Sequence, residues 1–148
     1  MKQFIVLIFV ISAINIVKSE CEDDCLCPDL LSLTQQADNF LYTKLAGCVS
    51  NMTCPADGLS AIVSSFSESE ISFNDSTEDF FGIFNSQIGE ATPAIDIYSF
   101  FGLICEDDKW YATKYPKRIT YFNAAGQVNT GAMEQLNGKK SLVKGITW

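Results

Sequence analysis

The placement of the cysteines is the feature that most constrains the fold of this 148-residue chain. All six lie between positions 21 and 105, and they are Cys21, Cys25, Cys27, Cys48, Cys54 and Cys105. An even number of cysteines in an exported chain predicts a set of disulfides. Zinc binding is disfavoured because the chain has no histidine and no Cys-x-x-Cys pair.

We expect every cysteine to be bridged, since a free thiol would oxidise outside the cell. Cys25 and Cys27 are too close in sequence to bridge each other easily, so they should reach different partners. Our preferred core link joins Cys54 to Cys105, which the strand pattern places on two facing strands.

The first nineteen residues predict an export signal. Lys2 gives a positive start, Phe4 to Val17 is an almost unbroken apolar run, and Val17 and Ser19 occupy the two positions that a signal peptidase reads. The run is shorter than the ~20 residues of a spanning helix. We therefore expect cleavage before Glu20, secretion to the extracellular space, and no stable membrane insertion afterwards.

The rest of the chain is expected to form a single domain with two parts. Residues 20–47 form a cysteine-rich segment, irregular or partly helical, in which Leu30 to Leu45 has a weak helical pattern that Gly47 would end. Residues 48–148 are β-rich, because apolar and polar residues alternate with period two. The predicted strands are Cys48 to Cys54, Leu59 to Phe66, Ile95 to Cys105 as the strongest, and Ile119 to Phe122.

Turn signals separate these strands. Pro55 to Gly58 and Glu106 to Lys109 predict turns, and Ser64 to Asp79 predicts an exposed connection in which Ile71 and Phe73 are apolar. Asn137-Gly138 predicts a two-residue hairpin turn. Short strands at this spacing are typical of a mainly β fold, so we expect a small, disulfide-linked, antiparallel β-sandwich of the immunoglobulin-like kind.

The cysteine pattern resembles a known family. Gly47-Cys48-x5-Cys54, then Leu103-Ile104-Cys105-x4-Trp110, then Ile119-Thr120 is similar to the nematode secreted cysteine-patterned domains called C6 or DUF281, and the CEDDCLCP opening resembles their start. The likeness covers about residues 21–123 and implies a secreted domain of unknown function. A closing cysteine would be expected soon after the Ile-Thr pair, and this chain lacks it, so the family's disulfide pairing is not transferred.

Charge is unevenly spread along the chain. Glu20 to Asp108 contains seventeen acidic residues and one base, Lys44, whereas Lys109 to Trp148 contains seven basic residues and one acid, Glu134. Either the two parts neutralise each other across one fold, which we favour, or the basic end forms an anion-binding patch. The candidate binding residues of such a patch are Lys114, Tyr115, Lys117, Arg118, Lys139, Lys140 and Lys144. Nucleic acid is an unfavourable partner for an exported acidic chain.

No catalytic constellation stands out. Without histidine, Ser-His and Cys-His catalysis are excluded within this chain. The many acids give no distinctive glycosidase pair, and neither Glu106-Asp107-Asp108 nor Asn74 to Asp79 has the spacing of a calcium loop. We expect no catalytic residue, no metal and no cofactor. Among the aromatic residues, Trp110 should be buried against a disulfide, and Tyr115 should be exposed.

Two sequons, Asn51-Met52-Thr53 and Asn74-Asp75-Ser76, predict N-glycosylation at Asn51 and Asn74. Taken together, these features predict a secreted, non-catalytic binding or recognition module whose partner is an unknown extracellular protein or glycan. The alternatives are a structural component of a secreted coat or matrix and, more remotely, a small secreted hydrolase.

Overall fold

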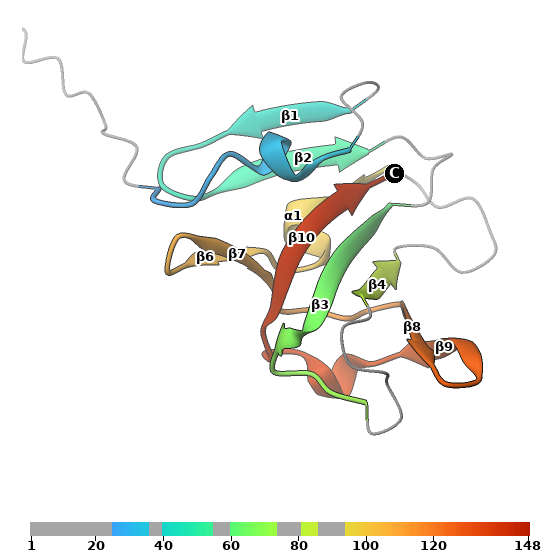
Figure 1. Cartoon of the computed structure of the whole chain (residues 1–148). Coiled ribbons are helices and arrows are strands. Elements are labelled where there is room, and N and C mark those ends of the chain that lie inside the picture. The colour runs from blue at the N-terminus through green and yellow to red at the C-terminus, as the bar shows by residue number, and fades with distance from the viewer. Residues whose placement is uncertain (1–24, 36–39, 55–59, 74–80, 86–93) are drawn as a thin grey trace, which may run out of the picture.

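A computed structural model of the chain describes residues 25–35, 40–54, 60–73, 81–85 and 94–148. Over these ranges the protein is mainly β, with two antiparallel sheets and two disulfides (Figure 1). The predicted fold class is thereby confirmed. The expected signal peptide, Cys21, the Pro55 to Gly58 turn and the sequon at Asn74 lie outside the described residues.

The larger sheet has the strand order β6-β7-β10-β3-β4-β8-β9. Its strands are β3 (Ala61–Ser69), β4 (Phe81–Asn85), β6 (Ile104–Glu106), β7 (Lys109–Ala112), β8 (Arg118–Asn123), β9 (Gly126–Ala132) and β10 (Ser141–Thr147). The smaller sheet has the order β1-β2-β5, from β1 (Leu41–Lys44), β2 (Ser50–Cys54) and β5 (Ile95–Asp96). The larger sheet holds more strands than either sheet of an immunoglobulin constant domain, so that likeness is limited to two antiparallel sheets around one core.

Strand β10 lies in the interior of the larger sheet, between β7 and β3. From Ser141 to Ile146 only Lys144 is exposed, and the pairing with β3 shifts in register on either side of Val143. A strand covered on both faces carries a run of apolar residues instead of an alternation.

One hydrophobic core is shared by the two sheets. Met52 and Cys54 of β2 are buried together with Ile62 of β3, Phe84 of β4 and Ile146 of β10. The alternation predicted for Cys48 to Cys54 is confirmed, because Ser50, Met52 and Cys54 face inward. Burying large apolar side chains on both sides of one interior is what joins the sheets into a single unit.

The strand predicted over Ile95 to Cys105 is wrong in its middle. β5 ends at Asp96, the short helix α1 (Ile97–Phe100) follows, and β6 begins only at Ile104. The carboxylate of Asp96 accepts hydrogen bonds from the backbone N–H groups of Tyr98 and Ser99, which is an N-cap. This local bonding starts a helical turn where the apolar pattern alone indicates an extended chain.

The predicted helix over Leu30 to Leu45 is limited to one 3-10 turn, η1 (Leu30–Leu33). Asp29 caps the turn through the backbone N–H of Leu31. The chain then forms an isolated parallel bridge between Thr34 and Ile146, and later enters strand β1. The apolar residues of this segment therefore do not share one face of a helix. Instead, η1 contacts β10, and β1 contacts β2.

Two of the turn predictions have opposite outcomes. The Glu106 to Lys109 turn is confirmed, because Asp107 and Asp108 have φ angles of 50° and 60° and connect the hairpin of β6 and β7. The Asn137-Gly138 hairpin is wrong: these residues follow the 3-10 turn η2 (Glu134–Leu136), β9 pairs with β8, and β10 pairs with β3 and β7.

The connection predicted from Ser64 to Asp79 is also partly wrong. Strand β3 continues to Ser69, and Ile71 is buried. The register of β3 with β10, from Thr147↔Ala61 to Ser141↔Ser69, keeps these polar residues in the sheet. The pairing of β3 with β10 thus outweighs the low intrinsic strand preference of these serine and glutamate residues.

Candidate functional site

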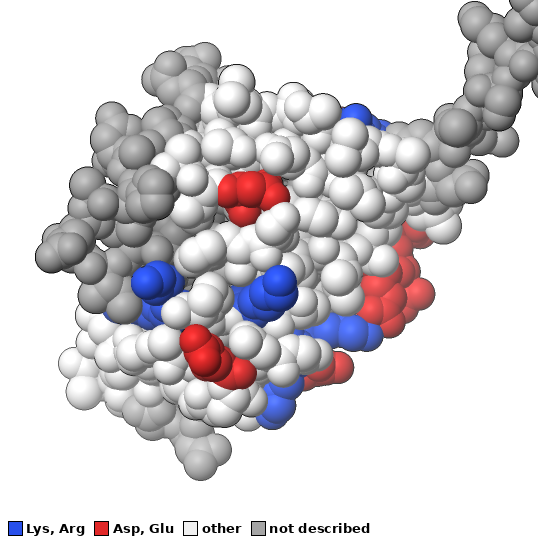
Figure 2. All heavy atoms as spheres, turned by 180° about the vertical axis from the view of Figure 1, so that it is seen from behind, with Lys and Arg blue, Asp and Glu red and all other residues white. Residues whose placement is uncertain are grey.

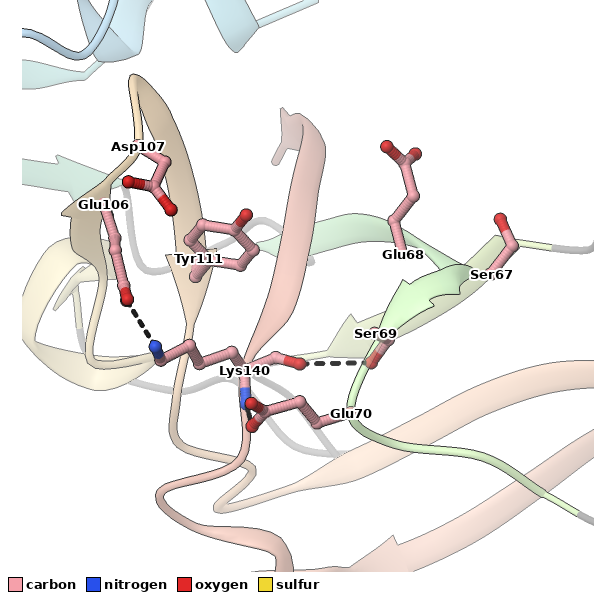
Figure 3. Close-up of a pocket in the computed structure, with 8 residues that line it drawn as sticks. All are labelled: Ser67, Glu68, Ser69, Glu70, Glu106, Asp107, Tyr111 and Lys140. Carbon is pink, nitrogen blue, oxygen red and sulfur yellow. Dashed lines mark hydrogen bonds and ion pairs between the residues drawn. The ribbon is translucent and has the colours of Figure 1, made fainter.

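A cleft of about 370 Å³ opens where the end of β3, the β6–β7 hairpin and the start of β10 come together (Figure 3). Three separate parts of the chain therefore supply its walls. The residues that line it are Ser67, Glu68, Ser69, Glu70, Glu106, Asp107, Tyr111 and Lys140.

Sheet order explains why these residues meet. Strand β10 pairs with β3 on one side and with β7 on the other. Ser141 at the start of β10 is opposite both Ser69 and Ala112, so the last residues of β3 lie on one side of Lys140 and the hairpin lies on the other. The left-handed conformation of Asp107 then closes the hairpin at the rim of the cleft.

Lys140 is held at three points within the cleft. Its Nζ forms an ion pair with Glu106 Oε2 at 2.5 Å, its backbone N–H donates to Glu70 Oε2 at 2.7 Å, and its carbonyl oxygen accepts from Ser69 Oγ at 3.3 Å. Hydrogen bonding to Glu106 raises the pKa of the Lys140 ammonium. The lysine is therefore occupied by acidic groups of the cleft wall.

A second ion pair lies next to the first. Lys144 Nζ contacts Glu68 Oε2 at 2.5 Å, and this hydrogen bond is the main cause of the lowered pKa of Glu68. Both side chains are well exposed, so the pair adds little to stability. Its consequence is local: Glu68 stays ionised beside the cleft.

The cleft carries an excess of negative charge. Four carboxylates, those of Glu68, Glu70, Glu106 and Asp107, line it, and two ammonium groups offset them in part, because Lys140 pairs with Glu106 and Lys144 pairs with Glu68. The half-buried ring of Tyr111 adds an aromatic surface. Carboxylates next to an aromatic ring suit a cationic group, which gains both charge attraction and contact with the ring.

A neighbouring hollow of about 280 Å³ shares Glu68 with the cleft. It is lined by Pro28, Leu33, Glu68, Asp108, Lys109, Trp110, Leu142, Val143 and Lys144. Its lining includes more apolar side chains than the first, so an extended ligand that crossed Glu68 would meet an acidic part and an apolar part.

Three of the basic residues proposed from the sequence make polar contacts within the protein. Besides the ion pairs of Lys140 and Lys144, Lys114 Nζ donates to the carbonyl oxygen of Ser99 at 3.3 Å. Lys117 and Arg118 are half-buried, and Lys139 is exposed. On the face shown in Figure 2, basic side chains are interspersed with acidic ones. These contacts agree with the favoured expectation that the acidic and basic parts neutralise each other.

Tyr115 is buried, so its predicted exposure is wrong. Its hydroxyl lies 3.0 Å from the carbonyl oxygen of Ala112, 2.8 Å from that of Lys139 and 3.1 Å from Ser141 Oγ. Burial raises its pKa to about 12. Asn137 Oδ1 also accepts the backbone N–H of Tyr115, which makes the Asn137-Gly138 dipeptide a support for this tyrosine.

Trp110 is buried, as predicted, opposite the disulfide cysteine Cys105 in the β6–β7 ladder. The disulfide pairing itself differs from our expectation. Cys105 is bonded to Cys27, and Cys25 is bonded to Cys48, so the preferred Cys54–Cys105 link is wrong. Cys54 carries a buried free thiol, which also overturns the expectation that every cysteine is bridged.

The sulfur atoms of Cys25, Cys48 and Cys105 lie within 4.8 Å of one another. All three belong to disulfides, and metal ligation requires thiolates, so this group brings two cross-links together instead of forming a metal centre. Asn51 of the first sequon is exposed on β2. In the part of the chain that the structure describes, no helix has the length and apolar character needed to cross a membrane.

Comparison with known proteins gives one family. No curated protein and no solved structure matches the chain. The family that matches over residues 20–148 is described as TRA-1 regulated protein R03H10.4, and not as C6 or DUF281. The resemblance is thus correct only at the level of a nematode cysteine-patterned domain. Because the match spans nearly the whole chain, this protein belongs to the family of TRA-1 regulated protein R03H10.4.

Proposed function

We propose that this chain is an exported, non-catalytic binding module that uses the acidic cleft to hold a cationic segment of an extracellular protein. The observation that carries the proposal is the convergence of four carboxylates and Tyr111 around one hollow, where the ion pairs of Lys140 with Glu106 and of Lys144 with Glu68 leave a formal excess of negative charge. Attraction between surface charges speeds the encounter with an oppositely charged partner and gives specificity.

Export is supported by independent features. The amino-terminal pattern has the composition of a signal peptide, and the two disulfides fit an oxidising compartment. N-terminal sequencing of the secreted protein should begin at Glu20. Retention of Met1 to Ser19 in the secreted material would contradict cleavage at that point.

The cleft can be tested with peptides of opposite charge. A blocked tetralysine peptide should bind the full chain, a blocked tetraglutamate peptide should not, and binding should weaken with added salt because charges are screened over ~8 Å at physiological ionic strength. Equal binding of the two peptides would refute a cationic ligand.

Matched substitutions place the binding on the protein. Asp107→Asn removes one cleft carboxylate, and asparagine tolerates the left-handed backbone that this position needs. Glu134→Gln makes the same change of charge on the exposed turn η2, outside the cleft. Asp107→Asn should weaken tetralysine binding several-fold, and Glu134→Gln should leave it unchanged. Equal loss in both variants would show that only net charge matters.

The non-catalytic part of the proposal rests on the absence of histidine from the sequence and on the absence of a distinctive carboxylate pair. General acid–base catalysis at neutral pH most often uses histidine. The purified protein should show no turnover on panels of ester, peptide and glycoside substrates. Hydrolysis that a single carboxylate substitution abolishes would overturn this part of the proposal.

A further inference from the structure

The outer face of the β1–β2 hairpin exposes large apolar side chains. Leu41, Leu45 and Val49 are 73%, 51% and 44% exposed, respectively. The opposite face of the same hairpin points into the core through Met52 and Cys54. The small sheet therefore has one face packed and one face open.

Asn51 lies at the centre of this open face. It is the register partner of Thr43 in β1, so the alternation of the strands places Leu41 and Leu45 diagonally on either side of it. Val49 precedes Asn51 by two residues on the same strand and therefore points the same way. The ladder continues to these outer residues, because the N–H of Leu45 donates to the carbonyl oxygen of Val49 at 3.0 Å.

The sequon has a defined geometry at this position. Asn51 and Thr53 point to the same face of β2, and the Thr53 hydroxyl donates to Asn51 Oδ1 at 2.8 Å. That contact is made to the amide oxygen and not to Nδ2, the atom that carries an N-linked sugar. Asn51 is exposed, so an attached oligosaccharide extends into solvent without disturbing Met52 or Cys54.

We propose that Asn51 is an N-glycosylation site whose oligosaccharide covers the apolar outer face of the β1–β2 hairpin formed by Leu41, Leu45 and Val49. The donor class is an oligosaccharide joined to a lipid through a diphosphate. Asn51 Nδ2 bonds to the anomeric carbon, the bond from that carbon to the diphosphate oxygen breaks, and one Nδ2 proton leaves with the lipid diphosphate. No oxidation or reduction takes place.

The arrangement favours a covalent sugar over a second copy of the chain as the covering group. The polar pair Asn51 and Thr43 separates Leu41 from Leu45 and Val49, so a protein partner closing on this face would have to bury both polar groups. A sugar fixed at the centre shields the surrounding side chains and stays hydrated. The inference rests on the proposed export, because only an exported chain meets the donor.

The site is tested by expressing the full chain in secreting eukaryotic cells, with and without an unrelated export leader placed before Met1. The background carries Asn74→Gln, so that Asn51 is the remaining sequon. Enzymatic removal of N-glycans should lower the protein mass and leave aspartate at position 51 in the peptide map. Asn51→Gln and Thr53→Ala should prevent the modification, and Thr53→Ser, which keeps the sequon, should retain it.

Secreted protein that carries no sugar at Asn51 would overturn the site. The same holds if the chain is secreted only with the added leader and still carries no sugar there. A chain glycosylated only with the added leader would support the site and contradict the native export signal. Tetralysine binding, measured on the same preparations, reports on the acidic cleft separately.

The covering role has its own measurement. Enzymatically deglycosylated protein should bind more of an apolar dye than the glycosylated form, because removal of the sugar leaves the apolar outer face of the hairpin open to the dye. Replacing Leu41, Leu45 and Val49 together by threonine should abolish that difference, since threonine suits exposed strand positions. Equal dye binding with and without the sugar would overturn the covering role.

Discussion

The indole Nε1 of Trp110 donates a 2.7 Å hydrogen bond to the backbone carbonyl oxygen of Pro28. This bond joins the β7 strand to the amino-terminal segment immediately after Cys27. The same two regions are linked covalently, because Cys27 is bonded to Cys105 and Cys105 is the register partner of Trp110. A hydrogen bond and a disulfide thus fasten the amino-terminal segment to the β6–β7 hairpin.

Trp110→Phe removes the donor and leaves the Pro28 carbonyl oxygen without this partner. The expected loss of unfolding free energy is roughly 1–3 kcal/mol, the range for a buried polar group left unsatisfied. Urea titration of the oxidised protein measures it. An unchanged free energy of unfolding in Trp110→Phe would contradict a contribution from this hydrogen bond.

The two disulfides should differ in their contribution to stability. Cys27 and Cys105 are separated by 78 residues, whereas Cys25 and Cys48 are separated by 23. The entropy that a cross-link removes from the unfolded chain grows with loop length, which gives about 4.5 kcal/mol for the longer loop and about 3.4 kcal/mol for the shorter.

Paired alanine variants measure this order. Cys27→Ala with Cys105→Ala should lower the urea midpoint more than Cys25→Ala with Cys48→Ala. The reverse order would show that the packing of the β1–β2 hairpin, and not loop length, determines the difference. Peptide mapping of each variant must also find the remaining disulfide unchanged.

The cysteine pairing shows how far the sequence could go. Alternation over Cys48 to Cys54 correctly placed Met52 and Cys54 on the buried face of β2. Its inward orientation favours a link from Cys54 to Cys105, which the structure does not form. Whether two cysteines can bond depends on their positions along their strands as well as on the faces they share. Cys105 lies in the β6–β7 hairpin beside the amino-terminal segment that carries Cys27. A period-two pattern does not show that Cys27 is the neighbour of Cys105.

The acidic cleft could not be predicted from the sequence for a related reason. The turn at Glu106 to Lys109 was predictable from its polar run, but its closeness to Glu70 depends on the placement of β10 between β3 and β7. The contact between Glu70 and Lys140 joins residues 70 positions apart. The sequence did contain one relevant signal, the surplus of acids before Lys109 and of bases after it, which predicted mutual neutralisation.

Stability should fall at alkaline pH because of Tyr115. Its pKa is about 12 in the folded protein and about 10 in an unfolded chain. Between these values the unfolded state loses the proton while the folded state keeps it, so the free energy of unfolding decreases as pH rises from about 10 to about 12. Below about 10 this contribution is fully present.

Tyr115→Phe tests the assignment. The variant loses the hydroxyl contacts and is less stable at neutral pH, yet its stability should fall less steeply above pH 10. Some slope should remain, because burial also raises the pKa values of Tyr42 and Tyr98. A Tyr115→Phe curve parallel to that of the unmodified protein would contradict the effect.

Cys54 should behave as an inert buried thiol. Its side chain is 1% exposed at the end of β2, and burial raises its pKa above the ordinary value. The raised pKa keeps it in the protonated form, whereas alkylation requires both contact with solvent and the thiolate. Iodoacetamide at pH 8 should therefore leave Cys54 unmodified in the folded protein and should modify it once urea unfolds the chain without reductant. Mass spectrometry of the peptide that contains Cys54 distinguishes these states.

Alkylation as fast in the native protein as in urea would show that this end of β2 opens readily. A disulfide-linked peptide containing Cys54 would contradict the free thiol, and if its partner were Cys105 it would also displace the Cys27–Cys105 bond that fastens the amino-terminal segment to the β6–β7 hairpin.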